Sequence, residues 1–190
     1  TLFPYTTLFR SLIYMINTPN TLATLRILVS PLIFWILLNR NEPPFGFHPT
    51  WMDYFAGSLF VLAGLTDFFD GFIARVWDEK TKLGSILDPL ADKMLTLAAF
   101  LGLMSTGIAS AWAVFIILTR EFFITGLRVV AVSDGKQVAA KWSGKLKTTV
   151  QLIAIGFLIM HWPFAETLLW AAVAVTVYSG YEYAKEYIKL

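Results

Sequence analysis

Four aspartates lie close together in a chain that is otherwise mostly apolar: Asp67, Asp70, Asp88 and Asp92. The first two are three residues apart and the last two are four residues apart, so each pair would share one face of a helix. Four like charges on two neighbouring helix faces repel one another unless cations hold them. Carboxylate oxygens suit hard divalent cations, so the spacing predicts a metal site. The alternative is structural ion pairing with cations elsewhere in the chain: Arg75, Lys93 and Arg120.

Two glycines and an arginine accompany the aspartates. Gly71 follows Asp70 directly, and Gly84 lies one helical turn before Asp88. A missing Cβ lets a phosphate or a sugar approach the backbone, although small residues also serve simple helix packing in membranes. Arg75 lies one turn beyond Gly71, where its guanidinium could clamp a pyrophosphate or, alternatively, snorkel to a membrane surface. The stretch therefore favours a phosphorylated ligand beside the metal.

The composition indicates an integral membrane protein. Of the 190 residues, 57% are hydrophobic and 15% are charged, and the mean hydropathy is +0.64. A soluble domain has about 25% charged residues. Cysteine is absent, which excludes a disulfide framework, a thiolate metal site and a cysteine nucleophile. We expect no nucleic-acid partner.

Six apolar segments approach the length of about 20 residues that a bilayer core requires. They lie at about 22–38, 51–74, 88–104, 111–132, 145–160 and 164–183. The sequence therefore predicts an all-α integral membrane protein with six transmembrane helices, and residues 12–190 form its membrane domain. The aspartates fall at the end of the second span and the start of the third.

The distribution of lysine and arginine predicts the topology. Basic residues gather in the links after the second and fourth spans and in the tail, whereas the opposite side has Arg40 alone. Because basic residues favour the cytoplasmic side, both termini are expected in the cytoplasm. The aspartates then lie in the cytoplasmic half of the bilayer.

The first eleven residues differ from the rest of the chain. The run Thr1-Leu-Phe-Pro-Tyr-Thr-Thr-Leu-Phe-Arg-Ser11 resembles the translation of a common DNA-sequencing adapter. We expect residues 1–11 to be a non-native addition and assign them no function. The alternative is a short amphipathic surface helix.

The aspartate stretch resembles the signature of a known family. The pattern Asp67-x-x-Asp70-Gly71-x-x-Ala74-Arg75, eight residues, Gly84-x-x-x-Asp88-x-x-x-Asp92 matches that of the CDP-alcohol phosphatidyltransferases at every fixed position. The resemblance implies a six-helix membrane enzyme, usually a homodimer, that transfers a phosphatidyl group from a CDP-linked lipid to an alcohol and releases CMP. It also implies a location in the bacterial cytoplasmic membrane, among membrane lipids, with the active site facing the cytoplasm.

The resemblance assigns roles to the matching positions. Asp67, Asp70 and Asp88 would hold Mg²⁺ or Mn²⁺, and Asp92 would act as general base and also approach the metal. Six residues would surround the CDP-lipid: Asp67, Gly71, Ala74, Arg75, Thr81 and Gly84.

Weaker motifs resemble the branch of the family that accepts sn-glycerol 3-phosphate and makes phosphatidylglycerophosphate from CDP-diacylglycerol. They are Thr119-Arg120-Glu121-Phe122, Gly126-Leu127-Arg128, Gly144-Lys145-x-Lys147-Thr148, and Pro19-Asn20-Thr21-Leu22 with Arg26. A phosphorylated acceptor needs cations, and four are available: Arg120, Arg128, Lys145 and Lys147. Asn20 and Arg26 would support the active site.

Some alternatives stay open. Glu121 and Arg128 are seven residues apart and could pair structurally. Lys145 and Lys147 lie about 200° apart on a helix, so both reach one phosphate only if that helix starts irregularly. The acceptor could be phosphatidylglycerol, which would yield cardiolipin, or another head-group alcohol. A different class of protein, a cation transporter, would use the aspartates as a transit site but would need no nucleotide clamp.

Overall fold

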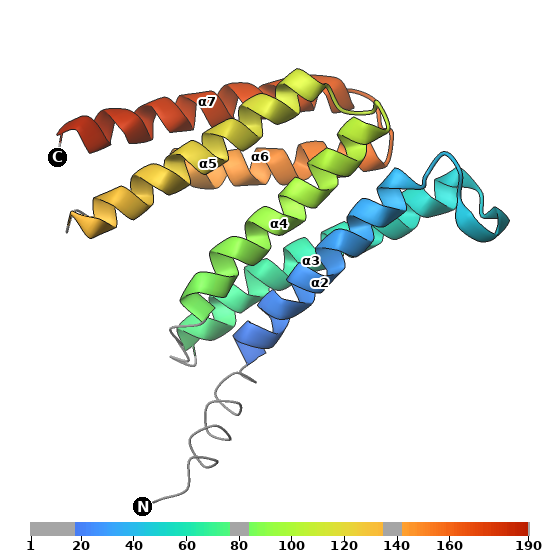
Figure 1. Ribbon diagram of the computed structural model, residues 1–190, viewed down its shortest axis with the longest axis horizontal. Coiled ribbons are helices and arrows are strands. Elements are labelled where there is room, and N and C mark those ends of the chain that lie inside the picture. The colour runs from blue at the N-terminus through green and yellow to red at the C-terminus, as the bar shows by residue number, and fades with distance from the viewer. Residues whose placement is uncertain (1–17, 77–83, 135–141, 190) are drawn as a thin grey trace, which may run out of the picture. The chain divides into compact units, whose positions relative to one another are not determined.

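The computed structural model describes residues 18–76, 84–134 and 142–189, and within them the chain is all-helical (Figure 1). Six long helices are joined by short links, one of which contains the 3₁₀ turn η1, Pro44–Gly46. The helices are α2 (Thr18–Leu38), α3 (Pro49–Val76), α4 (Gly84–Ser105), α5 (Ala111–Ser133), α6 (Trp142–Ile159) and α7 (Ala165–Lys189). The expected helix number and all-α class are confirmed. The expected non-native segment, residues 1–11, lies outside the described residues.

Several helices are longer than the apolar segments that predicted them. Helix α4 begins at Gly84, four residues before the expected start, and α7 continues to Lys189. Helix α6 begins at Trp142, so Lys145 and Lys147 both lie inside a continuous helix. The reason is that an apolar span reports only the part that would cross the bilayer, whereas backbone hydrogen bonding continues into the polar ends.

The chain divides into two compact units, Thr1–Ala99 and Phe100–Leu190. In the first, α2 packs against α3. Buried residues of both helices form the contact, among them Ala23, Ile33, Ala56 and Phe60. Small residues such as alanine allow two helix backbones to approach closely.

An ion pair closes the α2–α3 hairpin at its loop end. Arg40 Nε donates to Asp53 Oδ1 at 2.6 Å, and Arg40 Nη2 donates to Asp53 Oδ2 at 3.0 Å. This two-point geometry is the strong form of an arginine–carboxylate contact. Asp53 was not singled out from the sequence, yet it gives Arg40 a structural role.

The second unit contains the end of α4 and the helices α5, α6 and α7. Helix α7 contacts both α5 and α6, as Figure 1 also shows. Its buried Leu169 and Ala172 belong to the same core as Ile117 of α5 and Ile155 of α6. The three helices therefore form one packed group organised around α7.

Among the described residues of the second unit, two tight turns use a left-handed residue to end a helix. Gly107 has φ +75°, and Ile108 N donates to Leu103 O at 2.9 Å. At the end of α6, His161 adopts φ 53°, and Trp162 N donates to Phe157 O at 3.0 Å. Both are six-to-one hydrogen bonds that satisfy a terminal carbonyl.

One helix of the described part of the chain is long and apolar enough to cross a membrane by itself, at Thr21–Leu38 of α2. The other long helices carry charged or polar residues that lower their mean hydropathy. Their outer faces are nevertheless strongly apolar: exposed side chains include Leu62, Trp112, Phe122, Val129 and Tyr178. Apolar faces of this extent indicate contact with a membrane or another apolar partner.

Candidate active site

The aspartate stretch lies on the end of α3 and the start of α4. Asp67 and Asp70 fall within Pro49–Val76, and Asp88 and Asp92 within Gly84–Ser105. The backbone is helical through all four positions, so the expected helical spacing of each pair holds. The four carboxylates thus belong to two helices joined by a link of seven residues, 77–83, which lies outside the described residues.

The structure describes the side chain of Asp92 but not those of the other three aspartates. Asp92 is half-buried, as is the adjacent Lys93. Thr96 Oγ1, one turn later, lies 3.3 Å from the carbonyl oxygen of Asp92. Among side chains that the structure describes, no group of three potential metal ligands is present. Three of the four predicted ligand side chains, those of Asp67, Asp70 and Asp88, lie outside that part.

The residues predicted to surround the CDP-lipid are placed by their backbone. Gly71, Ala74 and Arg75 lie on the last turns of α3, and Gly84 is the first residue of α4. Their side chains lie outside the described part of the chain, and Thr81 falls in the undescribed link. The stretch from Asp70 to Arg75 is continuous helix, so Gly71 and Arg75 share one face, as expected for i and i+4.

Arg26 is among the most deeply buried side chains described, with 1% of its surface exposed. It lies on α2, in the same unit as the aspartate stretch, and α2 packs against α3. Ser30 Oγ donates to the carbonyl oxygen of Arg26 at 2.7 Å. A buried guanidinium must be compensated by polar or anionic groups. Asn20 lies on the first turn of α2, and its side chain is not described.

The second unit brings together two of the four cations predicted to bind the acceptor. Arg120 of α5 and Lys147 of α6 both donate to Glu121 Oε1, Arg120 through Nη1 at 3.2 Å. The side chains of Arg120, Glu121 and Lys147 are 13%, 17% and 10% exposed. The two cations therefore share one carboxylate at a largely buried position, and the group carries a net positive charge.

The guanidinium of Arg120 is also held by α7. Nη2 donates to Ser179 Oγ at 2.9 Å. Gly180 lies directly beneath the side chain: a Cβ added there would be 3.1 Å from Arg120 Cγ and 3.2 Å from Nε. Sequence reasoning missed both residues. A Ser-Gly pair inside a long helix was the available signal, because an interior glycine costs about 1 kcal/mol relative to alanine and needs a compensating reason.

The other two predicted cations lie elsewhere in the second unit. Arg128 of α5 is exposed, and its Cζ lies 5.6 Å from the ring centre of Tyr183 on α7, which is a cation–π contact. Lys145 is exposed, whereas Lys147 is buried on the same regular helix. The structure therefore groups Arg120 with Lys147, and it does not direct Lys145 to the same carboxylate.

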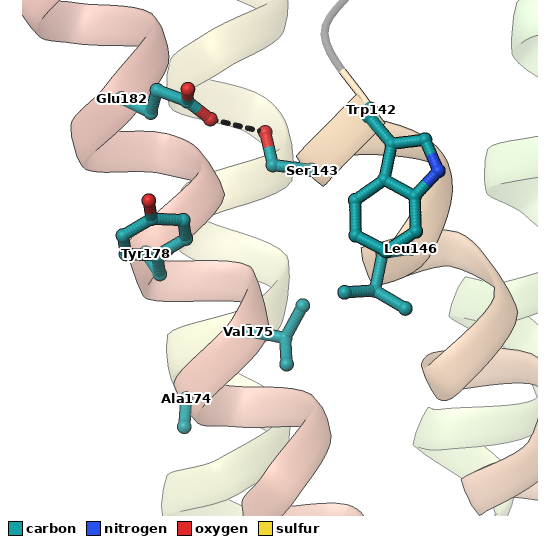
Figure 2. Close-up of a pocket in the computed structure, with 7 residues that line it drawn as sticks. All are labelled: Trp142, Ser143, Leu146, Ala174, Val175, Tyr178 and Glu182. Carbon is teal, nitrogen blue, oxygen red and sulfur yellow. Dashed lines mark hydrogen bonds between the residues drawn. The ribbon is translucent and has the colours of Figure 1, made fainter.

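A cavity of about 640 Å³ opens between α6 and α7 (Figure 2). Its walls include Trp142, Leu146 and Val175, and at one edge Ser143 Oγ donates to Glu182 Oε2. None of the residues predicted for the active site lines it. Apolar walls with a single polar edge suit an aliphatic chain better than a phosphate.

Comparison with known proteins places the chain beside lipid-synthesising enzymes. Residues 16–178 match the family model described as CDP-alcohol phosphatidyltransferase. The chain is 40% identical over 181 residues to the CDP-diacylglycerol–glycerol-3-phosphate 3-phosphatidyltransferase of Bacillus subtilis (strain 168), covering 89% of this chain and 94% of that protein.

Two further relatives carry similar names. A probable phosphatidylglycerophosphate synthase of Mycobacterium tuberculosis (strain H37Rv) is 36% identical over 172 residues, covering 88% of this chain and 79% of that protein. The CDP-diacylglycerol–glycerol-3-phosphate 3-phosphatidyltransferase of Escherichia coli (strain K12) is 36% identical over 148 residues, covering 75% of this chain and 76% of that protein.

Proposed function

Because the chain belongs to the CDP-alcohol phosphatidyltransferase family, we propose that it transfers the phosphatidyl group of CDP-diacylglycerol to sn-glycerol 3-phosphate. The products are phosphatidylglycerophosphate and CMP. The observation that carries this proposal is the similarity to the relative from Bacillus subtilis, which bears the name of this activity. The two chains are 40% identical, and the alignment covers 94% of the relative's length.

The aspartates fit a divalent cation. The donor set is entirely carboxylate, and the two pairs, Asp67 with Asp70 and Asp88 with Asp92, lie on continuous helices at spacings that share a face. This hard, oxygen-only set suits Mg²⁺ or Mn²⁺. The chemistry supplied by such an ion is neutralisation of the pyrophosphate and of the charge that develops on the departing CMP.

Asp92 serves as the general base. Its carboxylate takes the proton of the acceptor hydroxyl as the acceptor oxygen bonds to the phosphorus that carries diacylglycerol. The bond from that phosphorus to the CMP oxygen breaks, and CMP leaves with the electron pair. Asp92 is suited to this role because it lies at the end of the stretch, is half-buried, and follows Asp88 by one turn.

The C-terminal end of α3 and the N-terminal end of α4 hold the nucleotide. Asp67, Gly71, Ala74 and Arg75 approach it from α3, and Gly84 from α4, with Thr81 between them. The glycines leave room for the phosphates, and the Arg75 guanidinium provides the two-point contact that phosphate oxygens favour. On the neighbouring helix α2, the buried Arg26 supports this site, and Asn20 supports it from the first turn.

Arg120 and Lys147 bind the phosphate of the acceptor. What supports this is their shared, largely buried position around Glu121, where a water-poor setting strengthens attraction for a phosphate dianion. Arg128 and Lys145 are exposed and contribute a broader positive field that attracts anionic substrate or lipid.

The enzyme spans the bacterial cytoplasmic membrane with helices α2 to α7, with both termini and the active site on the cytoplasmic side, and it acts as a homodimer. The exposed apolar faces of the helices support membrane insertion. The charged residues that lower their hydropathy are compensated inside the protein, as Arg120, Glu121 and Lys147 illustrate. Charges within a membrane are tolerated when they pair in this way.

The test is an acceptor assay. Purified protein is supplied with CDP-diacylglycerol and Mg²⁺, and CMP release is measured with sn-glycerol 3-phosphate or phosphatidylglycerol as acceptor. Release with glycerol 3-phosphate and formation of phosphatidylglycerophosphate are expected. Release only with phosphatidylglycerol would show a cardiolipin-forming enzyme instead. The absence of CMP release with either acceptor would contradict both assignments.

A further inference from the structure

Gly180 creates the space in which the Arg120 side chain lies. The Cβ of an alanine at this position would be 3.1 Å from Arg120 Cγ, 3.2 Å from Nε and 3.7 Å from Cδ. The first two separations are shorter than an ordinary van der Waals contact between such atoms, which is about 3.5 to 4.0 Å. The Arg120 side chain could therefore keep its present conformation only if residue 180 has no side chain.

The far end of the same side chain is held at two points. Nη2 donates to Ser179 Oγ at 2.9 Å, and Nη1 donates to Glu121 Oε1 at 3.2 Å. Lys147 donates to the same carboxylate oxygen from α6. Glycine thus fixes the stem of Arg120, whereas serine and glutamate fix its charged end. Together these contacts hold two cations, from different helices, at a fixed separation.

We propose that Ser179 and Gly180 are positioning residues that set the affinity for the phosphate of the acceptor by fixing the Arg120 guanidinium. The inference rests on the proposed function, because it concerns the acceptor site of that reaction. A phosphate dianion is recognised best by donors that are already oriented, since little rotamer entropy is then lost on binding. An arginine has five N–H donors, so those that Ser179 and Glu121 do not use remain for the ligand.

The expected effect of a side chain at position 180 is local. The arginine stem is flexible and can move by a few tenths of an ångström, so Gly180→Ala should displace the guanidinium without unfolding α7. Ser179→Ala removes one anchor and adds no bulk. It therefore tests the same idea without steric strain.

The experiment measures initial rates of CMP release from the purified full chain while sn-glycerol 3-phosphate is varied at saturating CDP-diacylglycerol. We expect each variant to raise KM for glycerol 3-phosphate about tenfold, which corresponds to losing one charge-assisted hydrogen bond. The value of kcat should stay within about twofold, because an interaction made equally in the ground state and the transition state changes KM alone. KM for CDP-diacylglycerol should not change.

The control is Gly156→Ala on α6, where an added Cβ would meet no atom of the described residues within 4 Å beyond its chain neighbours and the adjacent helix backbone. It should leave both KM values unchanged. The double variant Ser179→Ala/Gly180→Ala adds a second check. Because both changes act through one guanidinium, their effects should combine to well under the roughly hundredfold rise expected of independent sites.

Each outcome decides the question. A selective rise in KM for glycerol 3-phosphate supports the inference. Unchanged KM in both single variants would overturn it, and so would a parallel loss of kcat and of affinity for both substrates, which would indicate a purely structural role. Absence of wild-type activity with glycerol 3-phosphate would refute the proposed function itself, and it would be seen before any variant is compared.

Discussion

Glu121 is expected to contribute more to stability than either cation that it holds. Its carboxylate accepts hydrogen bonds from both Arg120 and Lys147, and all three side chains are less than one-fifth exposed. Replacing Glu121 by alanine removes two charge-assisted hydrogen bonds, each worth about 1.5–3 kcal/mol. Replacing Lys147 by alanine removes one of them and leaves Glu121 with Arg120. Glu121→Ala should therefore lower the free energy of unfolding more than Lys147→Ala does.

The magnitude follows from this count. Glu121→Ala should lower the free energy of unfolding by about 3 kcal/mol or more, and Lys147→Ala by about half as much. For a chain of this size, 1 kcal/mol corresponds to about 2–4 °C in melting temperature, so the expected shifts are about 6–12 °C and 3–6 °C. The double variant Glu121→Ala/Lys147→Ala should melt at a higher temperature than Glu121→Ala alone, because it also removes one of the two cations that share the carboxylate.

The assay is thermal unfolding of the purified protein in one detergent, followed by tryptophan fluorescence at constant ionic strength. Lys145→Ala is the matched control, because Lys145 lies on the same helix but is exposed, and it should leave the melting temperature unchanged. A Glu121→Ala variant that melts within about 2 °C of the wild type would refute the reasoning, since that shift is typical of a solvent-screened pair. Equal falls in melting temperature for Glu121→Ala and Lys147→Ala would refute the expectation that Glu121 contributes more to stability than Lys147.

Three further outcomes are expected. Asp92→Asn should reduce kcat by about 10²–10⁴-fold, the usual contribution of a general base, while CDP-diacylglycerol still binds; near-normal turnover would exclude this role. Removal of divalent cations with a chelator should abolish CMP release, and Mg²⁺ or Mn²⁺ should restore it; activity that survives the chelator would count against the aspartates as metal ligands. Arg40→Ala should destabilise the α2–α3 hairpin by about 2 kcal/mol and leave kcat unchanged in the folded protein, because it breaks the two-point ion pair with Asp53 far from the aspartate stretch in sequence. A lower kcat in that variant would contradict the purely structural role.

The helices and the aspartate spacing could be predicted from the sequence because both depend on local geometry. Helical periodicity decides which residues share a face over four or five positions, and this is why Asp67 with Asp70 and Asp88 with Asp92 fall on α3 and α4 as expected. The helix ends were less predictable. Gly84 and Lys189 lie beyond the apolar segments, in polar sequence where hydropathy carries no signal.

The sequence predicts six membrane spans. Among the described residues, one helix is apolar enough to cross a membrane by itself, at Thr21–Leu38 of α2. The others contain charges, and a hydropathy average counts every charge as exposed to lipid. Asp53 with Arg40, and Glu121 with Lys147, show that tertiary pairing compensates such charges.

The sequence alone determined the class of the fold, the pairing of the aspartates along their helices and the resemblance that predicts the chemistry. Which cations act together depends on tertiary packing. Lys147 is 26 positions from Glu121, and Ser179 is 59 positions from Arg120. Such contacts depend on how each helix is rotated toward its neighbour, and no local period encodes that rotation. The same packing turns Lys147 inward and Lys145 outward, and it explains why α7 has a glycine where Arg120 crosses it.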